Sequence, residues 1–151
     1  MGLLKEDTIF SAVMINCWAF DVDGTLIGSI RSERLRPGAA ELLAALAERE
    51  VRTVLWSAGG ADYAARMADR HGIAGYFDGY YAKQLRGADG RYVAGHFAPS
   101  HRPSLFVDDS PGEMPADSAV VRVPQFFGGN AADRALWDLA ERLDLLLGGD
   151  A

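Results

Sequence analysis

Apolar and polar residues follow one another in blocks that predict strands alternating with helices. The segment before Asp21 is rich in Val, Ile and aromatic residues and predicts a buried strand. A second strand is predicted over "RTVLWSA", ending at Ser57, and a third over "YFDGYYAK". The segments "SLFVDD" and "SAVVRV" predict a fourth and a fifth strand.

Three segments between or after these strands predict helices. The first is "RPGAAELLAALAEREV", over Pro37 to Glu50, where Pro37 suits the first turn. Its apolar face is formed by Leu42, Leu43, Leu46 and Ala47. The second is "ADYAARMADRHGI", with Gly72 as its stop, and the third is "NAADRALWDLAERLDLLL", with Asn130 as its cap. "GADGRY" predicts a tight turn between two short extended pieces.

This order predicts an α/β fold: a three-layer, Rossmann-like sandwich with a mainly parallel central sheet and helices on both faces. The length of 151 residues and the lack of repeats or linkers predict a single domain, 1–151. Ligands of such sheets bind outside the carboxyl ends of the strands. We therefore expect the polar residues at three strand ends to meet at one edge: Asp21, Asp23, Ser57, Asp108 and Asp109.

The net charge of -6 argues against a broad electrostatic grip on nucleic acid, so such a partner is not favoured, although a local basic patch leaves it open. Two groups of basic residues are either solvated loop charges or a rim that attracts an anionic substrate. They are Arg31, Arg34 and Arg36, and then Arg86, Arg91, His96, His101 and Arg102.

The single cysteine, Cys17, excludes an internal disulfide and a cysteine zinc cluster and fits a reducing cytoplasm. The start "MGLLKEDTIF" carries Glu6 and Asp7 where a signal peptide would be basic. The longest mostly apolar run, Ile9 to Phe20, is too short to span a bilayer. These features predict a cytoplasmic protein with no membrane partner.

Four carboxylates at one sheet edge would repel one another without a cation. An all-oxygen cluster suits a hard divalent ion, Mg²⁺ before others, and Mg²⁺ also binds substrate phosphate. Such an ion would hold Asp21 ionised and would neutralise a phosphoryl group. An ionised aspartate can then attack phosphorus and form an aspartyl phosphate.

Further residues suit the binding of phosphate. The Ser57 hydroxyl can hold a phosphate oxygen, and Lys83, one of only two lysines, follows the third predicted strand as a point charge. Backbone N–H groups that could hold the phosphate belong to Gly24, Thr25, Ala58 and Gly59. Taken singly, Ser57 is an ordinary strand-end hydroxyl, Lys83 a surface lysine, and the Asp108–Asp109 pair a helix cap. Their common order and placement favour phosphoryl transfer.

With these motifs the chain resembles the haloacid dehalogenase (HAD) superfamily of phosphohydrolases. "FDVDGTL" matches the first motif of that family, and "VLWSA" matches the second, with Ser57 in the hydroxyl position. Lys83 matches the third motif by its spacing before Asp108. "LFVDDSPGE" matches the fourth, with Glu113 in place of a more usual acid four residues after Asp109.

The resemblance implies a role for each matching residue. Asp21 would be the nucleophile and a Mg²⁺ ligand, and Asp23 the general acid/base, with its main-chain oxygen on the metal. Asp109 would bind the metal directly, and Asp108 directly or through water. Family members that hydrolyse phosphate esters keep the second aspartate, so Asp23 implies a Mg²⁺-dependent phosphomonoester phosphatase.

The resemblance also implies a capless, C0-like member. A helix fills much of the interval from Asp23 to Trp56, which leaves "LIGSIRSERL" as a small flap and no room for a lid domain. Capless members tend to act on large substrates or to be covered by neighbouring subunits. A phosphorylated small molecule or macromolecule is therefore expected as substrate, and a homo-oligomer is open. The tail "VVRVPQFFGGNAADRALWDLAERL" also resembles the distal part of the RNA polymerase tail phosphatases.

Two questions stay open, one about the third motif and one about function. "AKQLRGADGRYV" lacks the common Lys-Pro form of the third motif, and Arg102, followed by a proline, could supply the cation in place of Lys83. For function, the alternatives are a non-catalytic or regulatory phosphate-binding module that keeps the fold, and a phosphotransferase that uses an acceptor other than water.

Overall fold

The computed structural model describes residues 16–29, 31–84 and 86–148. The predicted start "MGLLKEDTIF" and most of the apolar run from Ile9 lie outside these residues. The strands are β1 (Cys17–Asp21), β2 (Arg52–Ser57), β3 (Gly79–Ala82), β4 (Leu105–Asp108) and β5 (Val120–Arg122). The α-helices are α2 (Ala39–Glu48), α3 (Ala61–Arg70), α4 (Ala135–Glu141) and α5 (Leu143–Leu146), and the 3₁₀ helices are η1 (Ala74–Tyr76), η2 (Pro99–His101) and η3 (Pro111–Glu113).

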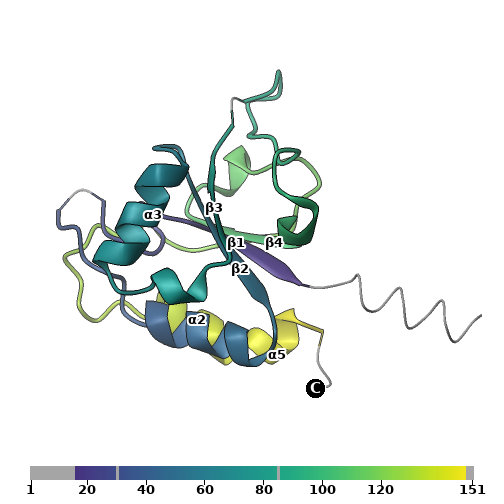
Figure 1. The fold of residues 1–151 in the computed structure, drawn as a ribbon. Helices are drawn as coiled ribbons and strands as arrows, with labels where there is room; N and C mark the ends of the chain where they lie inside the picture. Colours follow the sequence, from purple (N-terminus) through teal and green to yellow (C-terminus); the bar gives the residue numbers. More distant parts are fainter. Residues whose placement is uncertain (1–15, 30, 85, 149–151) are drawn as a thin grey trace, which may run out of the picture.

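The five strands form one parallel sheet in the order β3-β2-β1-β4-β5 (Figure 1). The chain moves from β1 outward to β2 and β3 and then crosses to β4 on the other side. The strand order therefore reverses at β1, where parallel sheets open a crevice. The register sets Asp21 opposite Trp56, and Ser57 opposite Ala82, so the carboxyl ends of β1, β2 and β3 are level.

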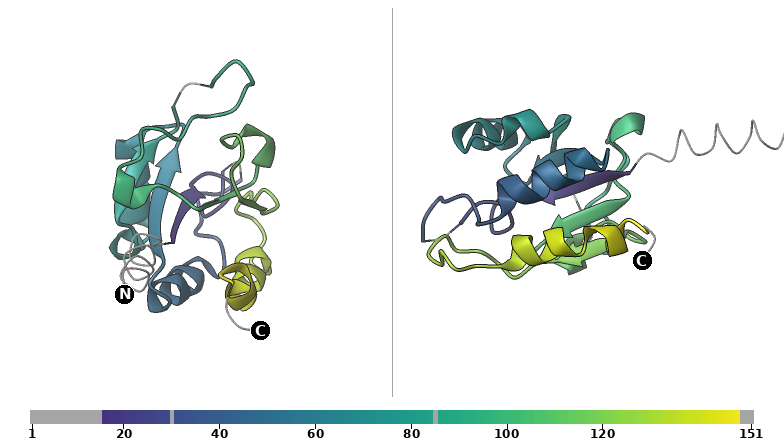
Figure 2. Two further views of the ribbon diagram at one scale, coloured as in Figure 1. Left: turned by 90° about the vertical axis from the view of Figure 1, so that its right-hand side faces the viewer. Right: turned by 90° about the horizontal axis from the view of Figure 1, so that it is seen from below.

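The sheet packs a different core on each face. Alternate strand residues such as Trp18, Phe20 and Leu55 join the four α-helices in the larger core, and Figure 2 shows α2 beside the α4–α5 pair. On the opposite face, Ala19, Trp56 and Phe106 pack in a smaller core. That core is closed by Phe97 and Met114, which belong to irregular chain around η2 and η3.

The α/β Rossmann-like fold is therefore confirmed, with one change to its layers. In the described part of the chain, the α-helices and η1 cover one face, while irregular segments with η2 and η3 cover the other. A parallel strand is apolar on both sides because both faces of its sheet are buried. Helices and irregular chain can each bury a face, so the strand sequences do not show which of the two lies there.

The last helix begins later than predicted. Asn130 was the expected cap, but its Oδ1 accepts a hydrogen bond from the amide of Ala132 in a turn. The helix α4 begins at Ala135, whose amide donates to Asp133 Oδ1. At the end of α3 the prediction holds, because Gly72 adopts φ +73° and its amide donates to the Asp69 carbonyl.

Neither long connection forms a cap domain within the described residues. The flap between β1 and α2 holds only two isolated bridges, Asp23 with Ile27 and Ile27 with Leu35. The "GADGRY" turn closes through the Gly90 amide and the Gly87 carbonyl, but no described residue beside it lies in a strand. None of the helices described here is both long and apolar enough for a membrane crossing.

Candidate active site

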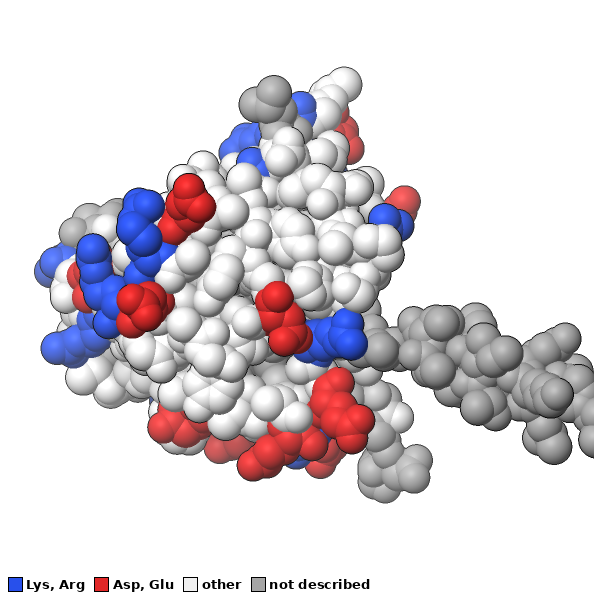
Figure 3. Space-filling model, in the orientation of Figure 1, with Lys and Arg blue, Asp and Glu red and all other residues white. Residues whose placement is uncertain are grey.

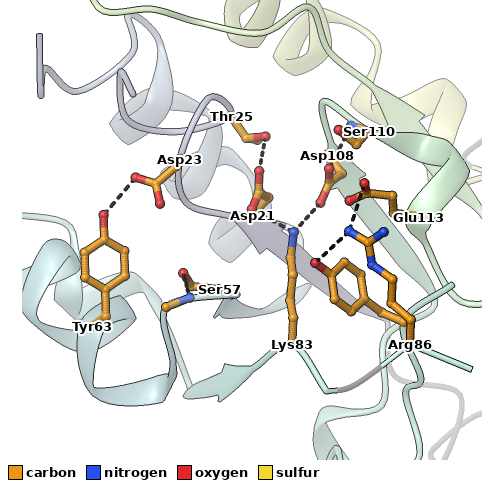
Figure 4. A network of polar contacts seen from close by, with 12 residues as sticks. Asp21, Asp23, Thr25, Ser57, Tyr63, Lys83, Arg86, Asp108, Ser110 and Glu113 are labelled. Atoms are coloured by element: carbon orange, nitrogen blue, oxygen red, sulfur yellow. Dashed lines mark hydrogen bonds and ion pairs between the residues drawn. The ribbon is translucent and has the colours of Figure 1, made fainter. Parts of the chain in front are cut away.

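An ion-pair network joins three strand ends at the carboxyl edge of the sheet (Figure 4). Lys83 Nζ lies 2.9 Å from Asp21 Oδ1 and 3.1 Å from Asp108 Oδ2. The lysine is positioned by its backbone, because the Lys83 amide donates to the Ser57 carbonyl at 2.9 Å and continues the β2–β3 ladder by one residue. The sheet register therefore brings Lys83 to the two carboxylates.

Aromatic rings surround the lysine on its other side. Lys83 Nζ lies 5.3 Å from the ring centroids of both Trp56 and Tyr92, within cation–π range. Arg86 lies 5.0 Å from the same Tyr92 ring and 3.0 Å from Glu113 Oε2. Glu113, which the fourth motif singled out, thus pairs with Arg86 and stands outside the carboxylate cluster.

Three carboxylates form a group that fits a metal ion. Asp21, Asp108 and Asp109 each offer one oxygen, and these oxygens all lie within 4.8 Å of one another. A Cβ on Gly24 would lie 2.6 Å from Asp109 Oδ2, and Gly24 has φ +83°, so only glycine lets the loop approach this carboxylate. The all-oxygen donor set suits a hard divalent cation.

The carboxylates carry more negative charge than Lys83 balances. Burial, partly offset by Lys83 and reinforced by Asp108 and Asp109, raises the pKa of Asp21 to about 7. Burial likewise raises the pKa of Asp108 to about 6. Burial alone would lower the pKa of Lys83, but the two carboxylates outweigh it and raise that pKa. A further cation would relieve this imbalance.

The loop after β1 holds Asp21 in place. Thr25 is buried, and its hydroxyl donates to Asp21 Oδ2 at 2.9 Å. We expected exposed amides at Gly24 and Thr25, but these amides donate to the carbonyls of Ile27 and Val22 inside the turn. In this conformation the two residues support the aspartate and do not offer free N–H groups to phosphate.

The loop after β2 is tied in a similar way. Ser57 is buried, and its hydroxyl accepts a hydrogen bond of 3.0 Å from the Gly59 amide. Ala58, between them, is exposed. Asp23 is exposed as well, and its Oδ1 accepts a hydrogen bond from the Tyr63 hydroxyl at 2.8 Å.

Arg102 lies at the other end of the sheet. It is exposed and precedes β4, and nearby Ser104 donates its amide to the carbonyl of Cys17 at the start of β1. The carboxyl ends of β1 and β4, with their aspartates, are at the opposite edge. Between the two candidate cations, only Lys83 lies against the carboxylates in the described structure.

Sequence reasoning missed the role of Arg36, which we grouped with two exposed arginines, Arg31 and Arg34. Arg36 is fully buried and makes a two-pronged ion pair with Asp133, at 2.8 and 3.1 Å. It also donates to the carbonyls of Thr25 and Pro124. Both of our expectations for Arg36, a solvated loop charge or part of a rim that attracts anions, are therefore wrong. No local signal marks it, because its partner is 97 residues away.

The second basic group is also largely engaged within the protein. His101 shares a hydrogen bond of 2.7 Å with the Tyr81 hydroxyl, and His96 Nε2 lies 2.7 Å from the Ala82 carbonyl. Arg91 donates to the Met114 carbonyl. These contacts stabilise the irregular chain over the smaller core, so the group is not a continuous rim.

Sequence reasoning also missed Tyr63 as a site residue, although its position in the sequence gives a weak indication. It follows Ser57 by six positions, on the first turn of a helix that begins directly after the second motif. An aromatic residue there is close to the carboxyl edge by topology alone. The sequence does not show that its hydroxyl reaches Asp23.

Comparison with known proteins identifies the family. A solved structure of an uncharacterized protein from Listeria monocytogenes serotype 4b has a similar fold, with a TM-score of 0.50, 18% identity, and coverage of 89% of this chain and 99% of that one. No curated protein matches the chain. The family model of the NLI interacting factor-like phosphatases matches residues 16–150. The chain therefore belongs to this HAD-like, capless phosphatase family and is a hydrolase of phosphate esters.

Proposed function

We propose that the protein is a Mg²⁺-dependent phosphomonoester phosphatase that works through an aspartyl phosphate on Asp21. The observation that carries this proposal is the bridge of Lys83 between Asp21 and Asp108, inside a group of three carboxylates at the carboxyl edge of the sheet. This arrangement combines a nucleophile, a cation for the transferring group and ligands for a metal at one point.

The carboxylates of Asp21, Asp108 and Asp109, with the main-chain oxygen of Asp23, would hold the Mg²⁺. The ion would neutralise the oxygens of the transferring phosphoryl group. The Thr25 hydroxyl holds Asp21 Oδ2 and Lys83 holds Asp21 Oδ1, and these two contacts would orient the carboxylate for attack on phosphorus. Lys83 and the Ser57 hydroxyl would bind the phosphoryl oxygens as the bond to the leaving group breaks.

Asp23 would act at both steps of the reaction. It first gives its proton to the leaving-group oxygen while the bond from Asp21 to phosphorus forms. It then takes a proton from a water molecule that attacks the aspartyl phosphate. Inorganic phosphate leaves, and Asp21 returns as a carboxylate. The substrate is a phosphate monoester on a small molecule or a macromolecule, and a lid that selects between them is absent from the described residues.

The test is hydrolysis of an aryl phosphate by the wild type, Asp21→Asn and a control, Asp144→Asn, which removes an exposed carboxylate on α5. We expect wild-type turnover to cease in chelator and to return with Mg²⁺. Asp21→Asn should lose turnover while it still folds, and Asp144→Asn should behave as the wild type. Mass spectrometry of acid-quenched wild type should detect a phosphoryl group on the peptide that contains Asp21. Appreciable turnover by pure Asp21→Asn protein would falsify the covalent mechanism.

A further inference from the structure

Tyr63, on the helix that follows the second motif, contacts Asp23, the exposed aspartate of the first motif. Its hydroxyl, from the first turn of α3, donates to Asp23 Oδ1 at 2.8 Å (Figure 4). Among the residues that the structure describes, Tyr63 is the side chain that hydrogen-bonds the Asp23 carboxylate. An exposed aspartate without such a partner would exchange freely between rotamers.

The Tyr63 ring is itself held in position. A Cβ on Gly59 would lie 2.9 Å from Tyr63 Cδ2 and 3.1 Å from Cγ, so the ring packs directly on the backbone of the loop after Ser57. The Arg66 guanidinium, three residues further along α3, lies 5.9 Å from the ring centroid. Gly59 therefore serves to admit the ring, which places the hydroxyl at a fixed point above the loop.

The hydroxyl remains a donor at neutral pH. Burial, the hydrogen bond to Asp23 and the Asp23 charge together raise the pKa of Tyr63 to about 12. Because the hydroxyl donates to one oxygen of Asp23 from a ring that is held in place, it fixes the orientation of the Asp23 carboxylate.

We infer that Tyr63 is the positioning residue of Asp23 and sets the direction in which Asp23 delivers its proton to the leaving-group oxygen. The inference rests on the proposed function, because it assumes that Asp23 is the general acid. Proton delivery matters most for a leaving group that is a strong base, since such a group cannot depart as an anion. The loss of positioning should therefore depend on the leaving group.

The experiment compares Tyr63→Phe with Tyr80→Phe, which removes a hydroxyl whose hydrogen bond among the described residues is a long one, 3.5 Å, to the Ala74 carbonyl. We expect Tyr63→Phe to lower kcat/KM about tenfold on phenyl phosphate and far less on nitrophenyl phosphate. A tenfold loss is a fraction of the roughly 10²–10⁴-fold that general acid catalysis contributes in full, because Asp23 itself remains. Tyr80→Phe should change neither value, and the melting temperature of Tyr63→Phe should match the wild type.

A double-mutant cycle tests whether Tyr63 acts through Asp23. On an Asp23→Asn background, Tyr63→Phe should cause no further loss on phenyl phosphate. Equal losses on the two esters, or an undiminished loss on the Asp23→Asn background, would overturn the inference and leave the proposed function intact. Wild-type turnover that does not need Asp21 would instead overturn the proposed function and the inference together.

Discussion

The negative charge of Asp21 is unfavourable when no metal is bound, because the side chain is buried beside other carboxylates and one lysine balances them. Its pKa rises from an ordinary value of 3.8 to about 7. The folded state therefore holds a proton on Asp21 that the unfolded state has released. Between about pH 4 and pH 7, the pKa values of Asp21 in the unfolded and folded states, the folded state binds more protons, so the free energy of unfolding falls as pH rises. The proposed nucleophile therefore lowers the stability of the folded state at the pH where it is ionised.

The metal-free Asp21→Asn protein should therefore be more stable than the metal-free wild type above about pH 7, where the wild-type carboxylate is charged. We expect a gain in melting temperature of about 4 °C, equivalent to roughly 1–2 kcal/mol for a chain of this size. The gain should shrink toward about pH 5, where the wild-type group is protonated in the folded state. Thermal melts in chelator measure it. A lower melting temperature for Asp21→Asn at the higher pH would contradict the explanation.

The sequence allowed us to predict which side chains at strand ends lie in the candidate site. It did not allow us to predict the side chains whose positions depend on contacts with residues far along the chain. Asp21 and Asp108 each end an apolar run, and Lys83 follows one, so topology alone brings them together. Arg36 and Tyr63 depend on partners across the fold, Asp133 and Asp23, which no local pattern announces. The late start of α4 has the same cause, because Asp133 turns to meet Arg36 and caps the Ala135 amide.

Two ion pairs connect the ends of α2 with the carboxyl-terminal helices, and they differ in burial. Arg36, before α2, pairs with Asp133, before α4, and these side chains are 0% and 15% exposed. Arg49, after α2, pairs with Asp144 of α5, and these side chains are 35% and 79% exposed. Breaking a buried pair leaves a charge without its partner in a poorly solvated site, whereas water replaces an exposed partner.

Asp133→Asn should accordingly lower the free energy of unfolding by about 3 kcal/mol, because Arg36 remains buried and charged. The asparagine keeps a side-chain oxygen that can accept the hydrogen bond from the Ala135 amide, so the loss reports the ion pair. Asp144→Asn is the matched variant and should cost less than about 1 kcal/mol. Urea denaturation of both variants gives the comparison. Similar losses for the two would mean that burial does not decide the strength of these pairs.

At the scale of the molecule, the face shown in Figure 3 carries its charge unevenly. On the face in Figure 3, acidic side chains gather along the edge formed by α2 and α5, and basic side chains gather around α3. Along α3 the first turn carries Asp62 and the last turn carries Arg70, so the basic end of this helix lies away from the carboxyl edge of the sheet.

The absence of a cap domain from the described residues leaves the site open to water. We therefore expect inorganic phosphate to remain the main product when ethanol or glycerol is added at high concentration, because no cap among these residues excludes water from the proposed aspartyl phosphate. Product analysis by phosphorus NMR separates inorganic phosphate from alkyl phosphates. A majority of alkyl phosphate would favour the phosphotransferase alternative over hydrolysis.

The position of Lys83 has a consequence for how this fold can diversify. The lysine is fixed across the sheet by the bond of its amide to Ser57, not by the length of chain that follows it. The residues described between Lys83 and Arg91 are exposed. Chain inserted there would lengthen a surface loop and leave the ammonium group against Asp21 and Asp108. This loop is therefore a natural place to graft a lid, by evolution or by design, and to acquire substrate selection without rebuilding the candidate active site.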